Sequence, residues 1–134
     1  MSNLSLHELG FGQGLIQHLS QYDPSSLLGF RCQPPYHWKS SSISNRPVVP
    51  LWECGTTLAY FHRDTQFFET CSLADIDNVW VRYKSIQAIL ADLLIDLYED
   101  ELTEDELRSA AKILGFQNIE RFICEIHARV KVVH

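Results

Sequence analysis

The chain has 134 residues, of which 46% are hydrophobic and 21% are charged, and its formal net charge at pH 7 is −6. This composition is typical of one globular domain over residues 1–134 and excludes a disordered chain. No apolar run reaches the ~20 residues of a membrane-spanning helix, and the opening residues show no secretory signal. We therefore expect a cytoplasmic protein that does not contact a membrane.

Residues 1–46 are predicted to form an irregular N-terminal part. The glycine-rich stretch Gly10–Gly14 lacks the preceding strand and the following Gly-Lys-Ser/Thr of a phosphate-binding loop. We interpret it as a flexible turn before a short amphipathic helix, which Asp23-Pro24 ends. The polar, proline-containing segment 25–46 is predicted to be a loop. Its aromatic residues either contact a partner or pack back against the core.

Residues 47–83 are predicted to form a small antiparallel sheet of about four strands. Apolar and aromatic runs alternate with turn-forming segments, which include Gly55, the polar loop 62–66 and the segment 75–78. The runs are Val48–Trp52, Leu58–Phe61, Phe67–Phe68 and Val79–Tyr83.

Residues 85–134 are predicted to be helical. After Ser85, which is an N-cap residue by type, an apolar stripe at helical spacing runs from Ile86 to Tyr98 and predicts a long amphipathic helix. Thr103 and Glu106 have the spacing of a capping box, and Gly115 is a typical helix stop. A third helix is predicted to start near Asn118. Its buried positions would be Ile119, Phe122, Ile123, Ile126 and Val130. The fold class is thus α+β, with the sheet covered by the long helix and a C-terminal αα-hairpin.

The cysteines and histidines give weak indications of chemistry. Cys32, Cys54, Cys71 and Cys124 are far apart in the sequence, so we interpret them as free thiols. The histidines show no metal-binding spacing, and we predict neither a metal site nor a cofactor. One catalytic alternative pairs Cys54 as a nucleophile with His62 as its base. Because a cysteine in a half-buried strand usually acts as a small apolar residue, we favour the structural interpretation.

Negative charge is concentrated between Asp75 and Glu106, where ten carboxylates accompany two basic residues. Such a surface disfavours binding to nucleic acid and suits a basic protein partner. Its densest part, residues 96–106, lacks the central glycine of a calcium loop. This part is either a solvated helix junction or a binding surface. The candidate partner-binding residues are Tyr36, Trp38, Asp100, Glu101, Glu104 and Asp105.

The run VVPLWECGTTLAYFHRDTQFFETCSL and the later SIQAILADLLIDLYED together suggest a family. A strand ending Pro50-Leu51-Trp52-Glu53, the turn glycine Gly55, two hairpin strands and a serine-capped aliphatic helix follow one another. This pattern resembles the SUKH superfamily of small α+β domains, over residues 48–100. Members of that superfamily include bacterial immunity proteins that neutralise toxins and a fungal regulator of cell-wall synthesis.

The resemblance implies a protein-binding module without catalytic activity. The expected function is that of an immunity protein, which blocks a cognate toxin such as a basic nuclease or deaminase. Two alternatives stay open. The first is a small hydrolase or thiol enzyme that uses Cys54 and His62, and the second is a regulatory scaffold without a toxin partner.

Overall fold

A computed structural model describes the backbone of residues 5–133 and the side chains of residues 5–127. The predicted α+β class and its four-stranded antiparallel sheet are confirmed. The strands are β1 (Val48–Cys54), β2 (Thr57–His62), β3 (Phe67–Ser72) and β4 (Asp75–Tyr83), and they lie in the order β1-β2-β3-β4. The α-helices in the described part are α1 (Leu6–Leu9), α2 (Gln13–Ser20), α3 (Ile86–Glu99), α4 (Glu104–Leu114) and α5 (Ile119–Val133).

The sheet is a meander in which each strand pairs with its neighbour in the sequence. Gly55 has φ +62° in the turn between β1 and β2, a left-handed conformation that glycine adopts without a steric penalty. The prediction that residues 75–78 form a turn is wrong, because β4 already begins at Asp75. These polar residues lie on an edge strand that is largely exposed, where polar side chains are tolerated and hinder edge-to-edge association.

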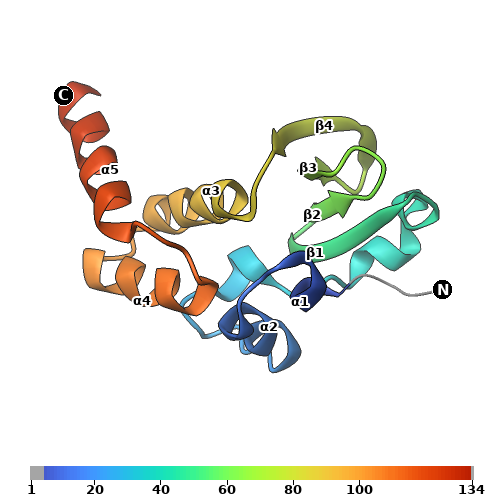
Figure 1. Cartoon of the computed structure of the whole chain (residues 1–134), viewed down its shortest axis with the longest axis horizontal. Coiled ribbons are helices and arrows are strands. Elements are labelled where there is room, and N and C mark those ends of the chain that lie inside the picture. Colours follow the sequence, from blue (N-terminus) through green and yellow to red (C-terminus); the bar gives the residue numbers. More distant parts are fainter. Residues whose placement is uncertain (1–4, 134) are drawn as a thin grey trace.

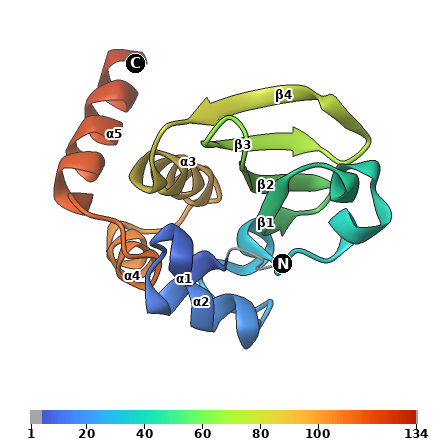
Figure 2. The ribbon, with the colours of Figure 1, turned by 45° about the vertical axis from the view of Figure 1, so that its right-hand side comes forward.

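The predicted long helix is confirmed as α3, and it supplies much of the core. The Ser85 side chain accepts a hydrogen bond from the backbone N–H of Ala88 at 3.1 Å, which caps the helix as expected. In Figures 1 and 2, α3 lies between the sheet and the later helices. Its buried residues are Ile89, Leu90, Leu93, Leu94 and Leu97. Burying each of these side chains contributes about 1.5–3 kcal/mol before the entropy cost is subtracted.

The two helices after α3 are joined by residues 115–118, as predicted. Thr103 and Glu106 form the capping box, and Gly115 ends α4 with φ +74°. The predicted burial of Phe122, Ile123 and Ile126 on α5 is confirmed, whereas the side chain of Val130 lies outside the described residues. After the link, α5 turns away from α4 (Figure 1).

Gly10 and Gly12 of the glycine-rich stretch precede α2, in agreement with a turn before a helix. Gly14 itself lies in α2, where that helix approaches α4 closely. A Cβ atom at Gly14 would lie 2.3 Å from the backbone oxygen of Ile113, so only glycine fits. The stretch therefore has a packing role at the contact between the N-terminal and C-terminal helices.

Segment 25–46 is more ordered than the predicted loop. It contains three 3₁₀ helices, η1 (Gly29–Cys32), η2 (His37–Ser40) and η3 (Ser42–Asn45). The latter two cover the face of the sheet opposite α3, where a second small core forms. This core contains Ile43, Val48, Leu58, Tyr60 and Cys71. Sequence periodicity missed these elements because helices of four residues are too short to show a period.

Candidate functional site

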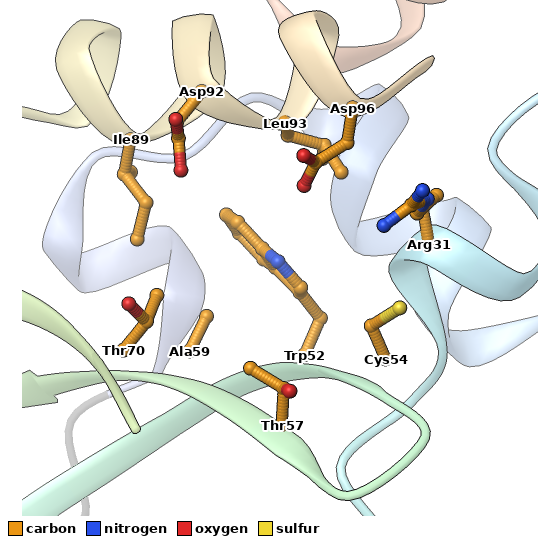
Figure 3. A pocket seen from close by; sticks show the side chains of 10 residues that line it. All are labelled: Arg31, Trp52, Cys54, Thr57, Ala59, Thr70, Ile89, Asp92, Leu93 and Asp96. Atoms are coloured by element: carbon orange, nitrogen blue, oxygen red, sulfur yellow. The ribbon is translucent and has the colours of Figure 1, made fainter. Parts of the chain in front are cut away.

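A small cleft opens between the sheet and α3. Its volume is about 60 Å³. The cleft is lined by Arg31, Trp52, Cys54, Thr57, Ala59, Thr70, Ile89, Asp92, Leu93 and Asp96. Figure 3 shows the Trp52 indole standing between the sheet and α3, with Asp92 and Asp96 above it and Arg31 and Cys54 at one end. Trp52 is 5% exposed, so it forms the floor of the cleft as part of the core.

The carboxylates of the cleft come from one side of α3. Asp92 and Asp96 are four residues apart and therefore project from the same face, and Glu99 continues that face by almost one more turn. The hydroxyl of Tyr83, at the end of β4, donates a hydrogen bond to Asp92. We call Asp92, Asp96 and Glu99 the α3 acidic stripe. In the sequence these residues lie off the apolar stripe of the helix. Local spacing therefore does not show that they lie at a cleft.

Asp96 is the least compensated member of the α3 acidic stripe. Partial burial raises the pKa of its carboxyl group, and the nearby charges of Asp92, Glu99 and Asp100 raise this pKa further, while Arg31 opposes the shift. Among the described side chains, Asp96 forms no ion pair. A half-buried carboxylate without a direct ion pair is electrostatically unfavourable, and a cationic ligand would relieve it.

One end of the cleft is closed by an ion pair that sequence analysis missed. Arg31 in η1 donates from Nε to Oδ2 of Asp100 and from its terminal nitrogen to Oδ1, both at 2.8 Å. The hydrogen bond from Arg31 lowers the pKa of Asp100. The pair joins residues 69 positions apart, so local sequence patterns carry no signal for it. Asp100, a predicted partner-binding residue, is therefore already engaged within the fold.

The pairing required by the thiol-enzyme alternative is not formed. Cys54 pairs with Thr57 at the turn end of the β1–β2 hairpin, whereas His62 pairs with Val48 at the opposite end. The Nδ1 atom of His62 instead accepts hydrogen bonds from backbone N–H groups of the following loop. Burial raises the pKa of the Cys54 thiol, although Arg31 opposes the shift, so the nucleophilic thiolate is disfavoured.

The two loop aromatic residues have different surroundings. Tyr36 is 78% exposed, whereas Trp38 is partly buried against the second core. The segment that carries them is held by Glu53, which is 1% exposed. The Glu53 carboxylate accepts the backbone N–H groups of Tyr36, His37 and Trp38 at 2.8–3.0 Å, and the Nδ1–H of His37 at 3.0 Å. These bonds satisfy a buried charge and fix the segment in place.

The remaining predicted residues lie at the junction of α3 and α4. Glu104 and Asp105 both pair with Arg108, at 3.5 Å and 3.0 Å, and Glu104 also lies 3.1 Å from Nε2 of His127. Glu101 is exposed and has φ +71° in the link between the helices. Of the four predicted acidic residues, Asp100, Glu104 and Asp105 are thus held in ion pairs. The residues that face the cleft lie further back in α3.

No group of three or more histidine, cysteine, aspartate or glutamate side chains in the described residues is placed to hold a metal ion. None of the described helices is long and apolar enough to cross a membrane.

Comparison with known proteins finds no matching family model, no matching curated protein and no matching solved structure.

Proposed function

We propose that this chain is a protein-binding module without catalytic activity, which neutralises a cognate basic toxin as an immunity protein. The observation that carries the proposal is the α3 acidic stripe beside the cleft. A lysine or arginine side chain of a partner placed there would meet the carboxylates of Asp92 and Asp96 in partly dehydrated surroundings. Attraction between opposite charges is stronger there than in bulk water.

The resemblance of residues 48–100 to the SUKH superfamily supports the immunity role within this proposal. A nuclease or deaminase is a suitable partner, because enzymes that bind nucleic acid carry positive surfaces. Opposite surface charge would speed the association of the two proteins, and a few central contacts would then set the affinity. The proposal includes a cytoplasmic location, which agrees with the four free cysteines.

The test is capture of the partner from the native host with the full chain as bait, followed by co-expression. We expect the wild-type chain to retain a basic protein whose expression alone stops growth, and co-expression to restore growth. The double variant Asp92→Asn, Asp96→Asn should retain far less of it and should fail to protect. The matched control is Asp64→Asn, Glu125→Gln, which neutralises two exposed carboxylates outside the cleft and should behave as wild type.

Two results would contradict the proposal. If the captured protein does not harm cells, the regulatory-scaffold alternative replaces the immunity role. If the double variant binds and protects as well as wild type, the cleft is not the contact surface, even where the immunity role stands.

A further inference from the structure

Arg63 differs from the other arginines whose side chains are described in this acidic protein. Six arginine side chains are described, and five of them form ion pairs with carboxylates. These five are Arg31, Arg46, Arg82, Arg108 and Arg121. Arg63 forms no such pair within the described residues, although its side chain is partly buried. Its Nε atom is fully buried and has no hydrogen-bond partner in this part of the chain. A buried donor in this state loses its hydration without compensation.

Arg63 lines a cavity at the β1 edge of the sheet. The cavity has a volume of about 330 Å³, and its other lining residues are Ser5, Leu6, Trp38, Val48, Val49 and Pro50. Apart from Ser5, these neighbours of the guanidinium are apolar. The volume is within the range of ~300–1,000 Å³ that is typical of small-molecule sites.

The walls of this cavity are held in place by the fold. Val48, Val49 and Pro50 belong to β1 and pair with β2. The backbone N–H of Trp38 donates to the buried Glu53 carboxylate at 2.9 Å. The backbone N–H of Arg63 donates to the carbonyl oxygen of Pro47 at 2.8 Å. A ligand would therefore enter a cavity whose walls are already ordered, which reduces the entropy cost of binding.

We propose that this cavity binds a small molecule with one carboxylate on an apolar body. The carboxylate would accept hydrogen bonds from the terminal nitrogens of the Arg63 guanidinium, and the planar groups match in geometry. The hydrocarbon or aromatic body would lie against Leu6, Trp38 and Pro50. Phosphate fits less well, because it is more strongly hydrated and the walls, apart from Ser5, are apolar. This site is separate from the acidic cleft, and its ligand has the opposite charge.

The test uses the full ¹⁵N-labelled chain and two probes, benzoate and hexanoate. The Arg63 Nε–H signal is identified by its absence from the spectrum of Arg63→Met. We expect at least one probe to move this signal downfield in a saturable manner. The neutral amides benzamide and hexanamide should bind about tenfold more weakly or not at all, because they cannot form the charge-assisted pair.

Variants separate the role of Arg63 from a general effect of charge. Arg63→Met should weaken binding by about tenfold or more, and Arg63→Lys should give an intermediate affinity because it keeps the charge without the planar fork. Arg121→Met, which removes an exposed arginine on α5, should bind as wild type. Backbone amide spectra verify that each variant is folded. The proposal is overturned if neither acid gives a saturable shift, if the amides bind equally well, or if both Arg63 variants bind as tightly as wild type.

Discussion

The C-terminal half of α3 and the first turn of α4 both carry clustered carboxylates, but their surroundings differ. On α4, Glu104, Asp105 and Glu106 lie at the positive end of a helix dipole, where negative charge stabilises the helix. Glu106 completes a capping box, and Arg108 pairs with the other two. These carboxylates contribute to the fold.

The α3 acidic stripe forms no ion pair among the described side chains. Asp96 and Glu99 approach the negative end of their helix dipole, and the last turn of α3 contains no basic residue. Partial burial and mutual repulsion raise the pKa of Asp96. Two clusters of acidic residues with similar composition therefore differ in their electrostatic surroundings. One cluster stabilises a helix, whereas the other places unfavourable charge at the cleft where we propose that a partner binds.

The largest expected effect concerns partner affinity. Asp92→Asn combined with Asp96→Asn should weaken binding of the captured partner by about ten- to a hundredfold, as expected when half-buried carboxylates lose their charge at an interface. The matching change on α4, Glu104→Gln with Asp105→Asn, should weaken it by less than about threefold, since these side chains already pair with Arg108. Titration calorimetry at two salt concentrations measures both. Equal losses at the two sites would remove the distinction between them.

The next effect concerns stability at α4. Thr103→Ala removes one half of the capping box and should lower the free energy of unfolding by about 1 kcal/mol, with partner affinity unchanged. Urea denaturation measures the loss. Thr103→Ser, which keeps the hydroxyl, serves as the control and should be close to wild type. A Thr103→Ala variant as stable as wild type would show that the cap contributes nothing.

A smaller effect is expected at the ion pair that closes the cleft. Arg31→Gln should lower the free energy of unfolding by about 0.5 kcal/mol, because the pair is partly exposed and solvent screens it. The pKa of Asp100 is lowered in the folded state, so this contribution is present above the unfolded pKa near 3.8 and is lost as the pH falls through the folded pKa. Thermal unfolding at pH 7 and pH 3 should therefore show a smaller difference from wild type at pH 3 than at pH 7.

The smallest effect is a gain in the free energy of unfolding rather than a loss. Because the folded-state pKa of Asp96 is raised, the fold holds its proton more tightly than the unfolded chain does, and stability falls as the pH rises above 3.8. Asp96→Asn should therefore raise the free energy of unfolding at pH 7, by less than about 0.5 kcal/mol for a partly exposed group. The gain should disappear below pH 3.8. Destabilisation by Asp96→Asn at neutral pH would contradict the assignment of unfavourable charge to the stripe.

Local patterns in the sequence were sufficient for most of the fold. The aliphatic stripe of α3, the serine before it and the capping box before α4 each depend on residues a few positions apart, and the structure confirms all three. The 3₁₀ helices of segment 25–46 and the early start of β4 were missed. The former are too short to show a period, and the latter begins with residue types that also favour turns.

The candidate site could not be predicted in the same way. Its acidic composition was visible, but the cleft depends on Trp52 lying beneath Asp92 and Asp96, and on Arg31 reaching Asp100. The same dependence on tertiary structure explains why the sequence left the Cys54–His62 alternative open. Both residues belong to one hairpin, and only the register shows that they lie at opposite ends.

The sequence alone therefore determined the class of fold, the order of its elements and the sign of its surface charge, because each follows from neighbours along the chain. Among the described side chains, tertiary structure decided which carboxylates form no ion pair and which arginine lacks a carboxylate. It also decided that Glu53 is buried, because only the folded chain brings the backbone donors of residues 36–38 to a carboxylate some fifteen positions away. Such pairings depend on contacts between distant segments, which no local periodicity encodes.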